Sequence, residues 1–215
     1  MCGRYKLTAE EIELRKKYGH IWDDHFFDIH GYKKRPEVFP GEWIPAIDRT
    51  HRLSDIWWTI EDKDARGEWR RAINGKAETI AKVGMFKDAF RNDRVLIPAT
   101  ALYEWQDVPG QKKKTRYEIW FDEPIFAFAG VARPCEIKGE MLRCGAILTT
   151  HPNETFKFIH TSKQRQAVVV REEDYDAWLD PDTSFDELRR IMEPLPDSET
   201  HFKVADDREE SPLFS

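Results

Sequence analysis

The stretch RVLIPATALYEWQ, residues 94–106, decides the fold predicted for this chain. Residues 94–99 and 102–106 are two short runs of aliphatic, β-branched and aromatic side chains, the composition typical of strands. Similar runs follow at intervals of roughly 8 to 15 residues, separated by Gly, Pro or charged clusters; they span 116–121, 125–132, 142–149 and 166–170. Short strands at this spacing predict a curved, mainly antiparallel sheet with a barrel-like shape.

Short helices are predicted on either side of this β-rich centre. Thr8 and Glu11 form a capping-box signature, which places a helix start near residue 9. The expected helices span 9–18, 85–90, 152–160, 175–179 and a last one that begins after Thr183 or Ser184. Residues 53–60 are expected to form another strand, 19–46 irregular chain with short extended pieces, and the charged stretch 61–71 a loop. With no repeat or long linker, the sequence predicts a single α+β domain over residues 1–215.

The composition excludes several classes of protein. Charged residues make up 34% of the 215 residues, and no apolar run approaches the roughly 20 residues that a bilayer span needs. The N-terminus lacks the basic segment and apolar core of a secretory signal. Three cysteines without CxxC spacing favour a reducing compartment and argue against a structural zinc site. We therefore expect a cytoplasmic protein with no membrane contact, no metal and no organic cofactor.

The net charge of −6 argues at first sight against a nucleic-acid partner. However, much of the excess negative charge lies in the C-terminal residues 194–215, whereas bases cluster at 33–35, 70–71 and 112–114. Local patches matter more than the total charge for phosphate binding. Taken alone, each cluster fits a solvated loop better than a DNA contact.

Cys2 carries the most specific chemistry in the sequence. Its side chain is small enough for Met1 to be removed, which would leave an α-amine and a thiol on adjacent carbons. An α-amine has a pKa of about 8, against about 10.4 for lysine, so more of it is uncharged near neutral pH. Such an amine attacks aldehydes to give a Schiff base, which the thiol can close into a five-membered thiazolidine. The alternative is that Cys2 is a small buried residue at the start of a strand.

Three further polar residues each allow two interpretations from the residues alone. Glu104 is either exposed on the open face of a sheet or held in a pocket with a raised pKa, as a proton shuttle requires. His160 follows an apolar helix face and could be a packing residue or a catalyst. Asn74 precedes Gly75, and this dipeptide is the commonest hairpin signal.

Six motifs in order give the sequence its resemblance to the SOS-response-associated peptidase (SRAP) family. They are MCGRY at 1–5, NGKAET at 74–79, VLIPA running into LYEW over 95–105, FAFAG at 126–130, AILTT at 146–150 and Ile159-His160. The resemblance covers residues 2 to about 170. It implies that the last segment of the chain returns to the domain as an edge element.

The resemblance also implies roles for the residues of the site. Cys2 supplies the amine and thiol, and Glu104 moves protons around that amine. Asn74 orients the amine, and His160 protonates the sugar ring oxygen so that the ring opens. The family usually continues after this histidine with Asp, Arg, Met and Pro, whereas this chain has TSKQRQ at 161–166.

Five residues are expected to contact DNA by the same resemblance: Arg4, Pro40, Trp69, Lys76 and Thr149. Lys76 stands where the family has an arginine; it keeps the charge but lacks the planar, two-pronged guanidinium. Trp69 lies beside Arg70 and Arg71, and an aromatic beside bases suits stacking on unpaired nucleotides, although core packing is an equal alternative.

The function expected from this resemblance is covalent cross-linking of abasic sites in single-stranded DNA through Cys2, with autoproteolytic removal of Met1. We expect a DNA-damage (SOS-response) enzyme with lyase-type chemistry and autopeptidase activity that acts as a monomer. One alternative is a cysteine-type protease that acts on other proteins through Cys2. Another is a divergent, non-catalytic module that binds single-stranded nucleic acid.

Overall fold

The computed structural model describes residues 2–18, 21–22, 32–64 and 66–205 of the chain. Its centre is a barrel in which each strand pairs with two neighbours in the order β13-β12-β9-β4-β5 and back to β13. The β5–β13 pair that closes the ring is parallel, and the others are antiparallel. The strands span Trp43–Ile47 (β4), Arg52–Trp58 (β5), Arg94–Ala99 (β9), Phe126–Ile137 (β12) and Glu140–Thr150 (β13).

Short strands extend this sheet beyond the barrel. The strand β8 (Asn74–Lys76) lies parallel to β13, and β14 (Gln166–Ala167) pairs with the same strand. The remaining pairs join β15 (Val169–Val170) to β12 and β2 (Ile21–Trp22) to β5. Gln166 to Val170 was predicted as one strand; it is two strands that pair with different neighbours.

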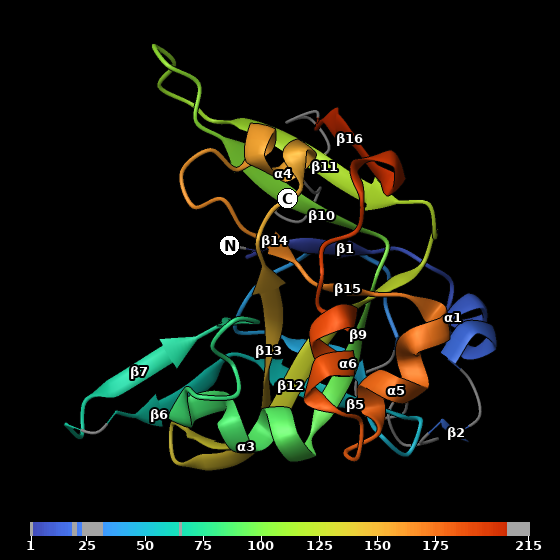
Figure 1. Ribbon diagram of the computed structural model, residues 1–215, viewed down its shortest axis with the longest axis vertical. Helices are drawn as coiled ribbons and strands as arrows, with labels where there is room; N and C mark the ends of the chain where they lie inside the picture. Colours follow the sequence, from blue (N-terminus) through green and yellow to red (C-terminus); the bar gives the residue numbers. More distant parts are fainter. Residues whose placement is uncertain (1, 19–20, 23–31, 65, 206–215) are drawn as a thin grey trace, which may run out of the picture.

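A second, five-stranded sheet lies against one end of the barrel (Figure 1). Its order is β16-β11-β10-β1-β3, and every neighbouring pair is antiparallel. The strands span Tyr5–Leu7 (β1), Arg35–Val38 (β3), Ala101–Gln106 (β10), Thr115–Phe121 (β11) and Thr200–Val204 (β16). Thr100 alone separates β9 from β10, so the predicted stretch 94–106 is the place where the chain passes from the barrel to the second sheet. The predicted α+β class with a curved, mainly antiparallel sheet is confirmed.

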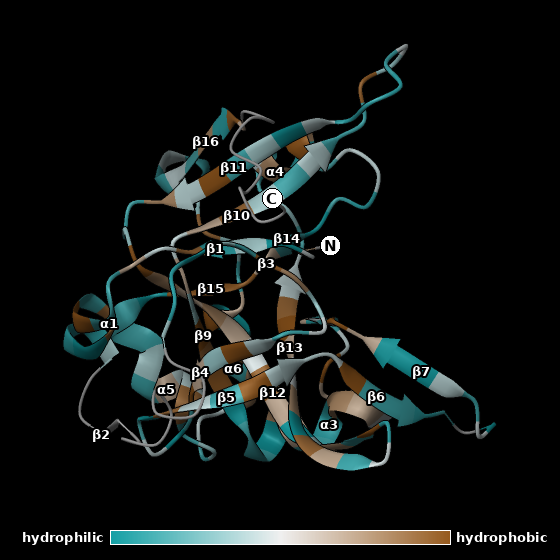
Figure 2. Cartoon of the chain, turned by 180° about the vertical axis from the view of Figure 1, so that it is seen from behind, coloured by the Kyte–Doolittle hydropathy of each residue, from teal (hydrophilic) through white to brown (hydrophobic). Residues whose placement is uncertain are grey.

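Residues 61–71, predicted as a loop, instead form most of a hairpin that projects from the barrel (Figure 1). Its strands are β6 (Ile60–Lys63) and β7 (Trp69–Ala72), and Arg71 forms an ion pair with Glu61 across them at 3.2 Å. β7 is largely hydrophilic, in contrast to the apolar barrel strands (Figure 2). A strand with polar residues on both faces lacks the alternation by which strands are recognised, which explains the wrong prediction.

The predicted helices are present, with shifted ends. They span Glu11–Tyr18 (α1), Gly84–Asn92 (α3), Glu154–Ile159 (α4), Tyr175–Leu179 (α5) and Phe185–Ile191 (α6). Asn153 caps α4, because its side chain accepts a hydrogen bond from Phe156 N. Ser184 caps α6 in the same way. Within the described residues no helix is long and apolar enough to cross a membrane.

The return of the chain end to the domain is confirmed as far as the structure describes it. β16 pairs with β11 over five residues and forms one edge of the five-stranded sheet. The other part of that prediction, for residues 211–214, lies outside the described residues.

Trp178 on α5 should be one of the most sensitive positions for stability. Its side chain is fully buried, and its Nε1 donates a hydrogen bond to Val95 O at 3.0 Å. Trp178→Ala should lower the free energy of unfolding by about 3–5 kcal/mol, because it leaves a cavity and removes the donor to a buried carbonyl. Urea denaturation would measure the change. Trp69→Ala, at a side chain that is 59% exposed, should change it by only about 0.5 kcal/mol or less.

Candidate functional site

Glu104 is buried in the middle of the second sheet. It lies on β10, opposite Tyr117 of β11, and only 3% of it is exposed. Burial penalises the charged carboxylate and raises the pKa of Glu104 to about 7. Of the two interpretations of this residue, the buried one is therefore correct. A carboxyl group that titrates near neutrality can both accept and return a proton at physiological pH.

Cys2 lies close enough to Glu104 for their charges to interact. Tyr103 N donates a hydrogen bond to Arg4 O at 3.0 Å, so the chain before β1 continues alongside β10 toward Glu104. The residue is fully buried. Burial, and to a lesser extent the negative charge of Glu104, raise the pKa of the Cys2 thiol well above its usual range. The thiol is therefore protonated at neutral pH, and it is not a preformed thiolate nucleophile.

His160 completes a cluster with these two residues. It follows α4 as the C-terminal cap, and its Nδ1 lies 3.9 Å from Glu104 Oε2. The same Nδ1 donates a hydrogen bond to Arg165 O at 3.0 Å, because a carbonyl oxygen can only accept. Burial lowers the pKa of His160 below its ordinary value. Burial thus favours the neutral form of each member of this pair.

Asn74 is not in a hairpin turn, because residues 74–76 form β8. Its Nδ2 donates to Ile147 O at 3.3 Å, while its buried Oδ1 has no hydrogen-bond partner among the described residues. Gly75 is required for close packing rather than for a turn, since a Cβ there would lie 2.4 Å from Ile80 Cδ1. Among the described residues no hydrogen bond joins Asn74 to Cys2, and Asn74 lies on β8, beside β13.

Two of the expected DNA contacts lie side by side. Lys76 on β8 pairs with Thr149 on β13, and the Lys76 side chain is exposed whereas Thr149 is buried. Thr149 Oγ1 donates a hydrogen bond to Gly75 O at 3.4 Å. Thr149 therefore holds β8 against the barrel in addition to any role toward DNA.

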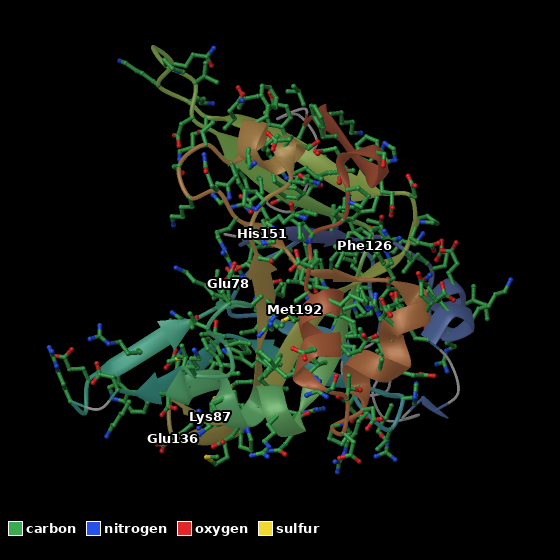
Figure 3. The ribbon with its side chains drawn as sticks, viewed as in Figure 1. Glu78, Lys87, Phe126, Glu136, His151 and Met192 are labelled. Atoms are coloured by element: carbon green, nitrogen blue, oxygen red, sulfur yellow. The ribbon has the colours of Figure 1, made fainter. Side chains whose placement is uncertain are left out.

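Arg165 was missed by the sequence analysis, although it links this strand pair to His160. Its guanidinium forms a two-pronged ion pair with Glu78, at 2.7 and 2.8 Å, and donates to Thr149 O at 2.5 Å. Its backbone carbonyl is the acceptor for His160 Nδ1. Figure 3 shows Glu78 and His151 near the C-terminal end of β13, where both residues line one cavity. Arg165 thus lies beside the Lys76–Thr149 pair, with its guanidinium bound to Glu78 and Thr149.

A second missed residue, Lys163, lies in the segment 161–165. Its positive charge acts on both Glu104 and His160 and lowers the pKa of each, although burial has the larger effect on both. The sequence analysis did not single out Lys163 or Arg165, because this short polar segment has no periodicity. The only signal in it was its departure from the family pattern.

Arg4 contacts Phe39, the residue that precedes Pro40. The Arg4 guanidinium lies over the rings of Phe39 and Trp105, at 4.4 and 4.9 Å from their centroids. Pro40 follows Phe39 in the turn that leads to β4. Arg4 also forms an ion pair with Glu37 at 3.5 Å.

Trp69 is not part of this cluster. It pairs with Lys63 as the last residue pair before the turn of the β6–β7 hairpin, and its ring lies 5.1 Å from Lys63 Nζ. Core packing is the wrong alternative for this tryptophan, because it is largely exposed on a projecting arm.

No group of three or more His, Cys, Asp or Glu side chains able to hold a metal ion occurs in the described part of the chain. The cysteines at 2, 135 and 144 are all free.

Comparisons with known proteins agree with this architecture. The abasic site processing protein YoaM of Bacillus subtilis (strain 168) is 30% identical over 201 residues, which cover 90% of this chain and 86% of that protein. The abasic site processing protein YedK of Escherichia coli (strain K12) is 25% identical over 201 residues, covering 89% and 85%. A crystal structure of a protein from Bacteroides thetaiotaomicron superposes with a TM-score of 0.83 at 22% identity, covering 96% and 93% of the two chains.

The family model for the SOS response associated peptidase (SRAP) matches residues 1–208, nearly the whole chain. The resemblance inferred from the six sequence motifs is therefore confirmed. This chain belongs to the SOS response associated peptidase family.

Proposed function

We propose that this protein captures abasic sites in single-stranded DNA as a covalent adduct at Cys2. The observation that carries the proposal is the buried cluster of Cys2, Glu104 and His160, in which the carboxyl has a pKa near 7 and the thiol is protonated. The relatives named above as abasic site processing proteins support the same substrate.

The amine must first be released. Hydrolysis of the Met1–Cys2 peptide bond consumes one water and yields free methionine and the Cys2 α-amine. Glu104 is the general base for that water, because its side chain is an ionised carboxylate above about pH 7. This autoproteolytic step is the peptidase activity that we assign to the chain.

The capture itself is a sequence of balanced steps. The closed abasic sugar opens to its aldehyde when His160 donates a proton to the ring oxygen and the anomeric hydroxyl loses its own proton to water. The neutral amine of Cys2 attacks the aldehyde carbon, and Glu104 takes the proton that the nitrogen loses. Glu104 then returns this proton to the hydroxyl group, which leaves as water, and an iminium forms. The Cys2 thiol then adds across the carbon–nitrogen bond, its sulfur to carbon and its proton released, and closes the thiazolidine ring.

A set of basic side chains around the cluster would hold the DNA backbone. Arg4, Lys76, Lys163 and Arg165 come from three different segments that the fold brings around Cys2, Glu104 and Thr149. Arginine suits phosphate because its planar fork donates two parallel hydrogen bonds. The Oδ1 of Asn74, which lacks a described partner, is a suitable acceptor for the amine.

The protease alternative is less well supported by the same geometry. A catalytic cysteine needs a thiol pKa lowered by a neighbouring cation, and here burial and the Glu104 charge raise it. The non-catalytic alternative rests on the altered Lys76 and on the altered segment after His160. Cys2, Asn74, Glu104 and His160 are nevertheless all present in the chain.

One experiment separates these functions. Incubation with single-stranded DNA that carries one abasic site, followed by a denaturing gel, should give a slow-migrating covalent band, and undamaged DNA of the same sequence should not. Cleavage of casein without such a band would favour the protease. Binding seen only on a native gel would favour the non-catalytic module.

A further inference from the structure

An aromatic patch of Tyr117, Phe158 and Phe202 lies beside the site and has no part in the chemistry above. The three ring centroids are 5.7 to 6.1 Å apart, so each ring contacts the other two. Tyr117 is buried, but Phe158 is 52% exposed and Phe202 is 43% exposed. A packing cluster would bury its rings, whereas contiguous exposed apolar surface marks a site of interaction.

The patch is continuous with the proposed catalytic cluster. Tyr117 on β11 pairs with Glu104 on β10 and with Val204 on the edge strand β16. The patch therefore lies between Glu104 and the edge of the sheet. Phe158 precedes His160 by two residues on α4, which covers this face of β10 and β11 in Figure 1. Gln106 joins the layers, because its Nε2 donates to Phe158 O at 2.7 Å and its Oε1 accepts from Tyr117 at 3.2 Å.

Two segments that adjoin the patch in the sequence carry lysines. Lys112 and Lys113 lie in the turn between β10 and β11, and Lys163 follows His160. Among the residues that the structure describes, none of these three forms an ion pair, whereas Lys114 and Lys157 are paired with Asp107 and Glu154. Exposed pairs of that kind contribute little stability and yield readily to a phosphate.

We propose that the aromatic patch is a stacking platform for unpaired bases of the DNA strand next to the abasic site. The inference rests on the proposed function and adds a second contact region to it. Rings that accept any base, with lysines beside them for the backbone, are the combination by which proteins hold single strands without reading their sequence. The platform would fix the strand on one side of the abasic sugar and hold that sugar at Glu104 and His160.

The test uses single-stranded oligonucleotides with one abasic site and 2-aminopurine at each flanking position in turn. The parent protein should quench 2-aminopurine fluorescence at one or more positions on one side of the abasic site. Phe202→Ala should abolish that quenching and weaken binding of the strand by about 5- to 150-fold, the range for the loss of a stacked base. Phe202→Leu, which keeps an apolar side chain without a ring, should also lose the quenching and guards against a folding defect.

Phe185→Ala is the matched control. Phe185 is 45% exposed and has Arg189 over its ring at 4.8 Å, but it lies on α6 outside the patch. This variant should bind and quench as the parent does. Quenching at no position, or quenching that survives in Phe202→Ala, would overturn the proposal. So would a Phe202→Ala variant that loses self-association in sedimentation while its DNA affinity stays unchanged, since a second copy of the chain would then occupy the patch. Failure of the parent to form any cross-link is a separate result that would count against the proposed function.

Discussion

Cys2→Ala is expected to abolish the stable cross-link to abasic DNA while leaving reversible DNA binding largely intact. The variant keeps an α-amine at residue 2 but has no sulfur to close the thiazolidine, so the reaction stops at a hydrolysable imine. Affinity depends instead on the basic side chains of other segments, such as Lys76 and Arg165. A denaturing gel measures the cross-link, and fluorescence anisotropy with undamaged single strands measures the binding.

Two controls make this prediction specific. Borohydride reduction should trap the imine of Cys2→Ala as a covalent band, which shows that the amine still reacts. Cys144→Ala removes another thiol that is fully buried, at a position on β13 outside the proposed site, and should cross-link as the parent does. A Cys2→Ala protein that cross-links as stably as the parent would remove the thiol from the mechanism.

Glu104→Gln is expected to slow imine formation by about 10²-fold or more, the usual scale for loss of a general acid–base group. Glutamine keeps the shape of the side chain but cannot exchange a proton. The parent should show a bell-shaped dependence of rate on pH, because the reaction needs Glu104 ionised and His160 protonated, and these two forms coexist only over a limited pH range. The limb with a midpoint near pH 7 should disappear in the variant. Rates measured from pH 5 to pH 9 test this, and coincident curves would make Glu104 a structural residue.

The same substitution should stabilise the fold at high pH. Because the folded state raises the pKa of Glu104 from its ordinary 4.5 to about 7, it binds this proton more tightly than the unfolded chain does. The contribution of Glu104 to the free energy of unfolding of the parent is therefore fully present below pH 4.5 and is lost as the pH rises through 7. Glu104→Gln escapes the loss and should be up to about 3 kcal/mol more stable than the parent at pH 8, with little difference at pH 4.5.

Glu118 provides the matched control for this stability effect. It lies on β11, one strand from Glu104, and is also buried. Burial alone would raise its pKa, but the hydrogen bond from Lys6 at 2.9 Å and the charges of Lys6 and Lys203 lower it overall. The contribution of Glu118 to the free energy of unfolding is therefore present above its ordinary pKa and is lost as the pH falls below that value. Glu118→Gln should thus destabilise at pH 8, the opposite sign from Glu104→Gln. Urea denaturation of both variants at pH 4.5 and 8 checks the two signs.

The sequence predicted four of the five barrel strands, because these are separated by Gly, Pro and charged clusters. It missed β4, which lies mostly within the stretch 19–46 that was predicted as irregular chain. It failed at 60–72, where both strands of the hairpin carry charges, and at β8, whose partner Ile147 is 73 residues away from Asn74. Parallel pairing over such a separation leaves no local pattern. An Asn-Gly pair was therefore equally compatible with a turn.

The site was predictable only in part. Family motifs singled out Cys2, Glu104 and His160, and the structure brings these three together. Residue patterns alone could not decide whether Glu104 is buried, since that depends on the strand β11 and helix α4 that cover it. Arg165 and Lys163 lie in a segment without periodicity, and their link to the site exists only through tertiary contacts with Thr149, Glu78 and His160.

The most direct test of the account is the mass of the cross-linked product, with the attachment site mapped by peptide fragmentation. The proposal predicts the mass of the protein without Met1 plus that of the DNA strand minus one water, with the DNA attached to residue 2. The loss of one water follows because imine formation expels it and ring closure by the thiol expels nothing further. An adduct that retains Met1, or that maps to a lysine such as Lys163, would contradict the central role of the Cys2 amine.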